Sequence, residues 1–149
     1  IIILKKNGGE VYQMSLQSVS GLSKIISLKV PSNIELLFSN DGNTHDTPRG
    51  VVTITGLFGR LIKKGWINEG SFIALPNNRR NISVQLATIS TALPIDFIQY
   101  QITGESQSGK VAYQSQGSFI YINPIPLLIL VLLVGAFIWL RKKKQNEKK

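Results

Sequence analysis

The sequence predicts a mainly β protein, an antiparallel β-sandwich followed by one C-terminal transmembrane α-helix. Two observations predict this fold class. Residues 1–124 contain about seven short runs of alternating hydrophobic and polar residues, separated by turn residues and with almost no helical periodicity. Residues 125–140 then form a stretch of sixteen positions without a charged side chain.

The strands are predicted from alternation and from turn residues. The segments 1–5 and 10–17 flank Asn7-Gly8-Gly9, a typical hairpin sequence. Further strands are expected at residues 33–40, 51–55, 81–86, 97–103 and 110–116, the last two joined by the loop sequence GESQSG.

The alternation also predicts which side chains form the core. Strand count places the sandwich in the immunoglobulin-like class, although the chain lacks the Cys-Trp-Cys pattern of antibody domains. The inward positions of the two clearest strands are Ile34, Leu36 and Phe38 in the first, and Ile82, Val84 and Leu86 in the second.

The helix at residues 125–140 is slightly shorter than the roughly 20 residues of a bilayer span, and the flanking residues extend it by snorkelling. A buried core helix normally has a polar face, and this segment has none. Tyr121 and Trp139 stand at its two ends, as interfacial aromatic residues do, and Pro126 suits the first helical turn. The lipid bilayer is therefore an expected partner.

The charges around the helix predict its orientation. Six Lys or Arg residues follow it, beginning with Arg141, Lys142, Lys143 and Lys144, whereas Lys110 is the only one in the twenty residues before it. The positive-inside rule then places the tail in the cytoplasm and the sandwich outside the cell membrane. We therefore expect an extracellular domain (1–119), a juxtamembrane segment (120–124), a transmembrane helix (125–140) and a cytoplasmic basic tail (141–149).

The chain begins with Ile-Ile-Ile-Leu and shows no signal peptide, which an exported domain needs. We therefore expect the C-terminal fragment of a longer ectodomain.

Composition excludes several classes of function. Cysteine is absent, which excludes disulfides, thiolate metal sites and Cys nucleophiles, and His45 is the only histidine. The formal net charge of +9 is concentrated in the basic tail, so no basic stripe for nucleic acid is expected on the domain. No cofactor is expected.

One stretch has a more specific pattern, N-x-G-N-x-H-x-x-P-x-G, carried by Asn40, Gly42, Asn43, His45, Pro48 and Gly50. It is followed by F-G and by L-P-x-x-x-R. This order resembles membrane-anchored bacterial surface proteins with a fimbrial-chaperone-like or WxL-interacting-like extracellular immunoglobulin-type domain. The resemblance implies a surface location and a role in adhesion or assembly, with no active site.

The same loop also has a purely structural interpretation. Asp41-Gly42 supplies a turn with positive φ, Asn40 and Asn43 bond neighbouring backbone, Gly50 allows close strand approach, and His45 donates to a loop carbonyl. Calcium binding is disfavoured, because an EF-hand loop needs Gly and Glu where this one has Asp46 and Val52.

Four further features have competing interpretations. His45, Asp96 and a serine satisfy the composition of a catalytic triad, but no local nucleophile motif accompanies them. Asn81 begins an N-glycosylation sequon, relevant only in an archaeon or a eukaryote. Trp66 is either an exposed binding residue or, as we prefer, a plug between the sheets. The basic residues Arg49, Arg60, Lys63, Lys64, Arg79 and Arg80 are interpreted as solvated loop charges, with anionic polymer or headgroups as the alternative.

These observations predict a non-enzymatic, single-pass cell-surface protein. Its domain would present upstream domains and contact a surface protein or a cell-wall polymer. The alternative is an accessory subunit of a larger membrane complex, whose helix packs against other helices.

Overall fold

The computed structural model describes residues 9–22 and 25–146, without the side chains of residues 127, 140 and 142–146. The predicted strand at residues 1–5 lies outside this range. In chain order the described elements are β1 (Met14–Ser20), β2 (Ile26–Ser27), β3 (Asn33–Asn40), β4 (Pro48–Thr55), the 3-10 turn η1 (Leu57–Gly59), β5 (Leu61–Ile67), β6 (Asn78–Gln85), β7 (Ala87–Thr88), β8 (Ile95–Ser106), β9 (Ala112–Ile122) and α1 (Pro124–Asn146).

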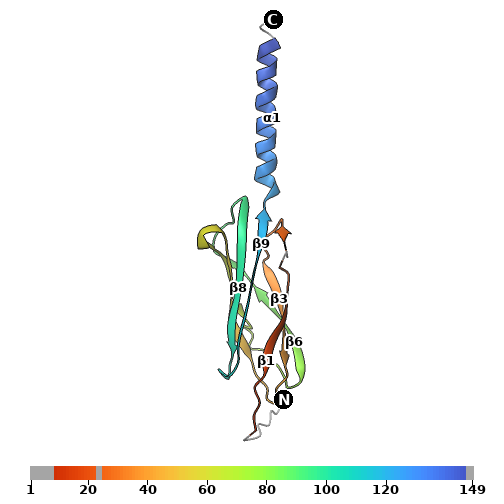
Figure 1. Ribbon diagram of the computed structural model, residues 1–149, viewed down its shortest axis with the longest axis vertical. Helices are drawn as coiled ribbons and strands as arrows, with labels where there is room; N and C mark the ends of the chain where they lie inside the picture. The colour runs from red at the N-terminus through yellow and green to blue at the C-terminus, as the bar shows by residue number, and fades with distance from the viewer. Residues whose placement is uncertain (1–8, 23–24, 147–149) are drawn as a thin grey trace.

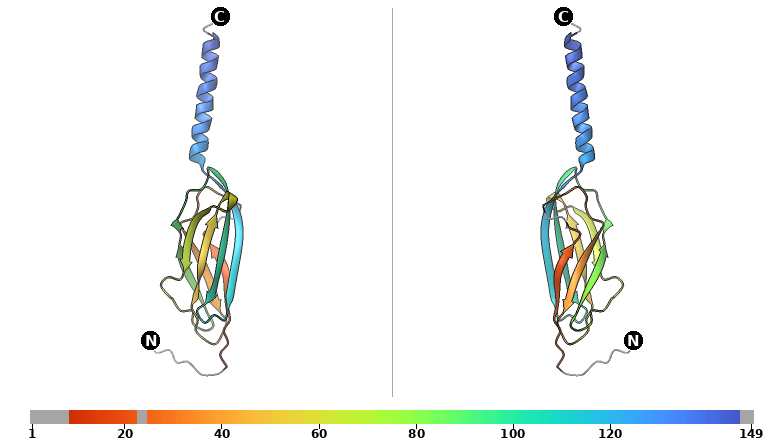
Figure 2. Two further views of the ribbon diagram at one scale, coloured as in Figure 1. Left: turned by 90° about the vertical axis from the view of Figure 1, so that its left-hand side faces the viewer. Right: turned by 90° about the vertical axis from the view of Figure 1, so that its right-hand side faces the viewer.

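The strands form two sheets, which confirms the predicted β-sandwich. One sheet has the order β1-β3-β6 and the other has the order β2-β9-β8-β4-β5-β7. Neighbouring strands are antiparallel except β2 and β9, which run parallel. The two sheets face each other, and α1 extends from one end of the sandwich (Figures 1 and 2).

The core lies between the sheets, and the predicted inward positions are buried. Ile34, Leu36 and Phe38 are at most 1% exposed, and Ile82 and Val84 are also buried. Since side chains alternate across a strand, Glu35 of β3 and Asn81 and Ser83 of β6 are exposed to solvent, whereas Ser39 and Asn40 at the end of β3 are buried. Facing them from the larger sheet are Val52, Ile54, Ile98, Ile102, Tyr113 and Phe119.

The sandwich has two ends, which differ in what they present. The proximal pole, from which α1 leaves, comprises residues 25–29, 56–60, 89–97 and 120–123. The distal pole, opposite to it, comprises residues 9–12, 41–49, 68–77 and 106–111. Figure 2 shows the chain entering β1 at the distal pole.

Strand β5 is absent from the sequence predictions, because its segment LIKKGWI does not alternate cleanly. The interpretation of Trp66 as a plug between the sheets is wrong. Its side chain is 57% exposed on the outer face of β5, and Lys64 Nζ lies 4.7 Å from its ring centroid. The aliphatic stem and the ammonium of Lys64 thus contact the Trp66 ring in place of the expected core residues.

Strand β9 continues to Ile122, which pairs with Ile95, and only Asn123 separates it from α1. Helix α1 stands clear of the sandwich in all three ribbon views (Figures 1 and 2). No helix in the described part of the chain combines the length and apolar character that crossing a bilayer requires. The transmembrane helix therefore stays a prediction.

Candidate functional site

The loop between β3 and β4 carries the sequence motif and lies at the distal pole. Asn40, at the end of β3, is 1% exposed. Its Nδ2 donates to the carbonyls of Thr44 (2.9 Å) and Ala74 (3.0 Å), and its Oδ1 accepts from the Gly42 N–H (3.1 Å). The last bond closes an Asx turn, as predicted for this asparagine.

The sequence predicts that Gly42 is required for a turn with positive φ, and this reason is wrong. Gly42 does not have the positive φ expected for an Asp-Gly turn. Instead, a Cβ at this position would collide with the backbone carbonyl of Val11. The flanking amides of Asp41 and Asn43 donate to the carbonyls of Gln13 (2.8 Å) and Val11 (3.1 Å), so the loop packs directly on the chain entering β1.

Asn43 also differs from its prediction, because it bonds distant rather than neighbouring backbone. Its Oδ1 accepts from the Val11 N–H (2.7 Å), and its Nδ2 donates to the Gly9 carbonyl (2.8 Å). The asparagine thus holds the segment that precedes β1 against the loop. Contacts across more than thirty residues leave no local sequence signal.

Pro48 and Gly50 begin strand β4. Pro48 is buried, and its carbonyl accepts a hydrogen bond from Asn68 Nδ2 (3.1 Å). A Cβ at Gly50 would collide with the Thr103 carbonyl of β8. The expected close approach between β4 and its neighbour is therefore confirmed.

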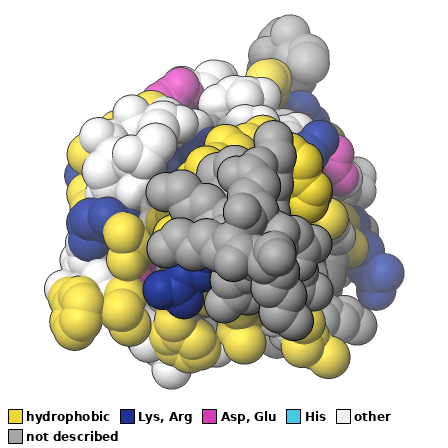
Figure 3. All heavy atoms as spheres, turned by 90° about the horizontal axis from the view of Figure 1, so that it is seen from above, with side chains coloured by type: hydrophobic (Ala, Val, Ile, Leu, Met, Phe, Trp, Pro, Cys, Tyr) yellow, Lys and Arg dark blue, Asp and Glu magenta, His cyan; other side chains and the backbone are white. Residues whose placement is uncertain are grey.

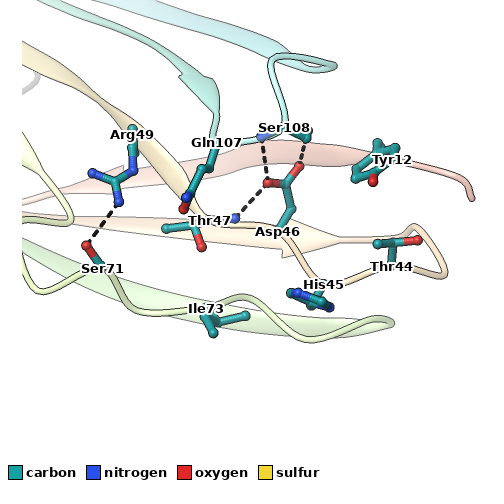
Figure 4. A pocket seen from close by; sticks show the side chains of 10 residues that line it. All are labelled: Tyr12, Thr44, His45, Asp46, Thr47, Arg49, Ser71, Ile73, Gln107 and Ser108. Atoms are coloured by element: carbon teal, nitrogen blue, oxygen red, sulfur yellow. Dashed lines mark hydrogen bonds between the residues drawn. The ribbon is translucent and has the colours of Figure 1, made fainter. Parts of the chain in front are cut away.

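Asp46 organises this loop through its hydrogen bonds, a role that the sequence analysis does not predict. It is 6% exposed, and its carboxylate accepts from the N–H groups of Thr47 (2.8 Å) and Ser108 (3.3 Å) and from Ser108 Oγ (2.7 Å). It thereby ties the motif loop to the β8–β9 turn (Figure 4). A buried carboxylate needs such donors, because burying it unpaired is costly.

An open pocket of about 440 Å³ lies beside this network. Figure 4 shows Arg49 and Ser71 at one end, joined by a 3.1 Å hydrogen bond, and Tyr12 and Thr44 at the other. Nine of the pocket's ten lining residues carry a polar group, which offers hydrogen-bond partners to a polar ligand, and Ile73 is the exception. The lining residues are Tyr12, Thr44, His45, Asp46, Thr47, Arg49, Ser71, Ile73, Gln107 and Ser108.

The candidate catalytic residues are not brought together. His45 is partly exposed, and its side chain makes no hydrogen bond with any residue that the structure describes, so the expected bond to a loop carbonyl is not formed. Asp96 lies at the proximal pole, the opposite end of the sandwich, where it pairs with Arg60. Ser108 Oγ is bonded to Asp46 rather than to an imidazole.

The oxygen and nitrogen ligands of the same loop do not converge either. Asp41 accepts from Ser39 Oγ (2.7 Å), whereas Asn43 faces the chain entering β1. Within residues 9–22 and 25–146, no three His, Asp or Glu side chains gather in the manner of a metal site.

The predicted anchor residues have different surroundings. Tyr121 is partly buried and packs against the hydrophobic core, whereas Trp139 is 64% exposed on α1. Pro126 lies in the first turn of α1, and the guanidinium of Arg141 stacks over the Phe137 ring at 5.2 Å. Lys142, Lys143 and Lys144 continue the helix, beyond the described side chains.

Asn81 lies on the outer face of β6, opposite in phase to the inward Ile82 and Val84, and is exposed. Its Nδ2 donates to Glu35 Oε2 of the neighbouring strand (3.1 Å). The sequon is thus accessible at the surface of the smaller sheet.

Neither a protein-family model nor a curated protein sequence matches this chain. The resemblance of the motif to bacterial surface proteins therefore rests on the motif residues alone.

Proposed function

We propose that this chain is the membrane-proximal part of a single-pass cell-surface protein. Helix α1 anchors it, the sandwich lies outside the cell and the basic tail lies in the cytoplasm. The function is non-enzymatic: the domain presents upstream domains and contacts a surface protein or a cell-wall polymer through its distal pole.

The observation that carries this proposal is the surface of α1. Its described large apolar side chains are all 50–68% exposed, from Ile125 to Trp139. A helix that is hydrophobic all round belongs in a protein core or in a membrane, and α1 extends away from the only core that the described residues form. Lipid is the medium that covers every face of an isolated apolar helix.

The uncharged segment is shorter than the hydrocarbon core is thick, and its flanking residues make up the difference. Sixteen residues rise about 24 Å at 1.5 Å per residue. The hydrocarbon core of a bilayer is about 30 Å thick. Asn123 and Pro124 on one side, and the long stems of the basic residues on the other, bridge the remaining distance. Six basic residues after the segment support a cytoplasmic tail.

The strand order supports an immunoglobulin-like assignment. In the constant type of that class, the first, second, fourth and fifth strands share one sheet, and the third, sixth and seventh strands form the other. Leaving aside the two-residue strands β2 and β7, the chain follows this arrangement except at its fourth strand: β1, β3 and β6 form one sheet, whereas β4, β8 and β9 form the other together with β5.

The position of the two chain ends supports a presenting role. The chain enters β1 at the distal pole and leaves through α1 at the proximal pole (Figure 2). Any preceding domain is therefore held on the far side of the sandwich from the bilayer. The polar pocket of Figure 4 lies at this distal pole, where a surface partner has access to it.

Cysteine labelling tests the topology, because the chain contains no cysteine. Gln107→Cys places a thiol on the exposed β8–β9 turn, and Gln145→Cys places one in the tail. Each variant is expressed in the full chain behind a signal peptide. In intact cells, an impermeant maleimide should label Gln107→Cys and spare Gln145→Cys until the membrane is opened.

Labelling of Gln145→Cys alone would contradict an external sandwich, and equal labelling of both before lysis would contradict a membrane span. Native electrophoresis in mild detergent tests the accessory-subunit alternative. That alternative requires co-migration with a defined larger membrane assembly.

A further inference from the structure

Exposed hydrophobic side chains are concentrated at the proximal pole. The described exposed large hydrophobic side chains outside α1 are fewer in the distal half of the sandwich, where they are Val11, Trp66, Phe72 and Leu75. Figure 3 looks onto the proximal pole and shows hydrophobic side chains along much of its visible rim. We call this group the apolar collar: Ile25, Ile26, Leu28, Leu57, Phe58, Ile89, Leu93, Ile95, Phe97 and Ile120.

Phe58 is the most exposed member of the collar, with 95% of its surface accessible. It lies at the tip of the β4–β5 connection with φ +62° and ψ 24°, in the left-handed region. A bulky residue rarely adopts this conformation, because its Cβ crowds the backbone. This backbone conformation therefore lowers the stability of the fold at a position where the aromatic ring contributes nothing to the core.

A buried carboxylate holds this tip in place. Asp96 is 2% exposed and accepts hydrogen bonds from the Leu57 N–H (2.7 Å) and the Leu93 N–H (2.9 Å). Arg60 Nη2 donates to Asp96 Oδ2 at 2.8 Å, the oxygen that also accepts the bond from the Leu93 N–H. The same side chain thus positions two separate collar loops, those that carry Phe58 and Leu93.

The collar ends abruptly on the outer face of the six-stranded sheet. Two successive cross-strand pairs, Ile95–Ile122 and Phe97–Ile120, are apolar, and the next pair, Gln99–Ser118, is polar. Successive pairs on one face are about 6.6 Å apart along the strand. The apolar band is therefore about as deep as the 5–10 Å to which interfacial segments enter a bilayer.

The charges at this pole suit an anionic lipid surface. Lys29 is exposed and follows the collar residues of β2, and Arg60, two residues after Phe58, is partly exposed. The one acidic side chain at the centre of the pole, Asp96, is buried and paired with Arg60. Basic residues at a membrane surface are attracted to anionic headgroups.

We propose that the apolar collar is a lipid-binding surface, seated at the headgroup–acyl boundary around the base of α1. This inference rests on the proposed function, since it takes α1 to be inserted in the same bilayer. The collar would hold the long axis of the sandwich roughly perpendicular to the membrane surface. Phe58 and Leu93 would enter the lipid, and the polar residues farther along the outer face of β4, β8 and β9 would stay in water, among them Thr53, Gln99, Gln101 and Gln116.

Single-cysteine labelling in liposomes tests this orientation. The full chain is reconstituted in vesicles of phosphatidylcholine and phosphatidylglycerol, with a nitrobenzoxadiazole label at Phe58→Cys or Leu93→Cys. Val131→Cys, in the middle of α1, reports insertion of the helix. Phe72→Cys is the matched control, because Phe72 is also an exposed phenylalanine but lies at the distal pole.

Lipids with a nitroxide on the upper acyl chain should quench the labels at positions 58, 93 and 131 and leave the label at position 72 unquenched. Quenching at position 131 alone would overturn the collar and leave the membrane anchor standing. Quenching at none of the four positions would overturn both proposals.

Two other results would overturn the collar by pointing to another occupant or orientation. A blue-shifted label at positions 58 and 93 without nitroxide quenching would mean that protein, such as a second copy of this chain, covers the pole. Equal quenching at positions 58 and 72 would mean that the sandwich lies on its side.

Discussion

Phe38 of β3 and Tyr113 of β9 meet edge to face between the two sheets, with ring centroids 5.0 Å apart and planes at 70°. Tyr113 also donates its hydroxyl hydrogen to the backbone carbonyl of Arg49 on β4. One aromatic side chain thus links both sheets of the sandwich and satisfies a polar group at the edge of the core.

We expect Tyr113→Phe to lower the free energy of unfolding by about 1–2 kcal/mol, because the Arg49 carbonyl loses a partly buried donor. Phe38→Ala should cost about 3–5 kcal/mol, since it removes a fully buried ring. Urea denaturation measures both values. A Tyr113→Phe variant as stable as the parent would mean that the hydroxyl contributes no net stabilisation.

Tyr113 should also make stability depend on alkaline pH. Burial raises the pKa of its phenol, against the weaker opposing effect of the hydrogen bond with Arg49. The unfolded phenol ionises near pH 10, as ordinary tyrosines do. Its stabilising contribution is therefore complete below about pH 10 and is lost as the pH rises further. Tyr113→Phe should flatten this alkaline loss in urea titrations.

The sandwich should fold without its helix. No described residue of α1 belongs to the hydrophobic core, and β9 completes its pairing at Ile122. A fragment of residues 1–123 should therefore show a β-type far-ultraviolet circular dichroism spectrum and a cooperative urea transition. A disordered spectrum would contradict an independent domain.

Substitution of Gly42 distinguishes close packing from turn conformation. Asparagine tolerates positive φ, so Gly42→Asn would be harmless if the residue served only an Asp-Gly turn. Because a Cβ there meets the Val11 carbonyl, we expect Gly42→Asn to cost about 2–4 kcal/mol. Gly109→Asn is the matched control: Gly109 has φ +67° and open space around it, so the variant should change stability little.

Asp96→Asn should destabilise the fragment by about 2–3 kcal/mol at neutral pH, because three donors lose their carboxylate. Burial alone raises the pKa of Asp96, but the bonds from Leu57, Leu93 and Arg60 outweigh burial and lower it. The carboxylate therefore stabilises the fold above about pH 4, the unfolded value, and this contribution is lost as the pH falls.

Urea titrations from neutral to acidic pH should show a flatter acid limb in Asp96→Asn than in the parent. Glu69→Gln is the control, because Glu69 is exposed and lies at the distal pole. An unchanged acid limb in Asp96→Asn would contradict the assigned role of this carboxylate.

Phe58→Asn should have opposite effects on stability and on lipid contact. Asparagine adopts the left-handed conformation more readily than phenylalanine, so the fragment should gain about 0.5–1 kcal/mol. The same substitution removes the most exposed apolar ring of the collar, so binding of the fragment to anionic vesicles should weaken. A loss of stability would mean that the ring is held by contacts within the sandwich.

The two clearest strands could be predicted because alternating hydrophobic side chains mark the face that each strand buries. Strand β3 begins and ends where the alternation of Ile34, Leu36 and Phe38 predicts, and Ile82 and Val84 of β6 are buried as expected. Strand β5 could not be predicted in this way, because it is bulged at Ile62, between the partners of Ile54 and Thr55, and buries the successive residues Ile62 and Lys63.

The candidate site was less accessible to prediction, because its contacts join distant segments. Asn40 acts locally, and its Asx turn was predicted correctly. Asn43, Asp46 and Gly42 act on residues about 30 to 60 positions away, so their roles became evident only from the fold. The collar is likewise assembled from four separate chain segments, which include the proximal ends of β8 and β9, and it leaves no continuous sequence pattern.

The parallel pairing of β2 with β9 has a mechanical consequence. A tensile force between the distal entrance and α1 would act along the strands, since β1 and β9 leave the sandwich at opposite ends (Figure 1). The bonds of the β2–β9 pair and of the β1–β3 pair would then be loaded together, in shear, rather than opened one after another. We expect such a domain to resist extension, as the proposed tether between a membrane and upstream domains requires.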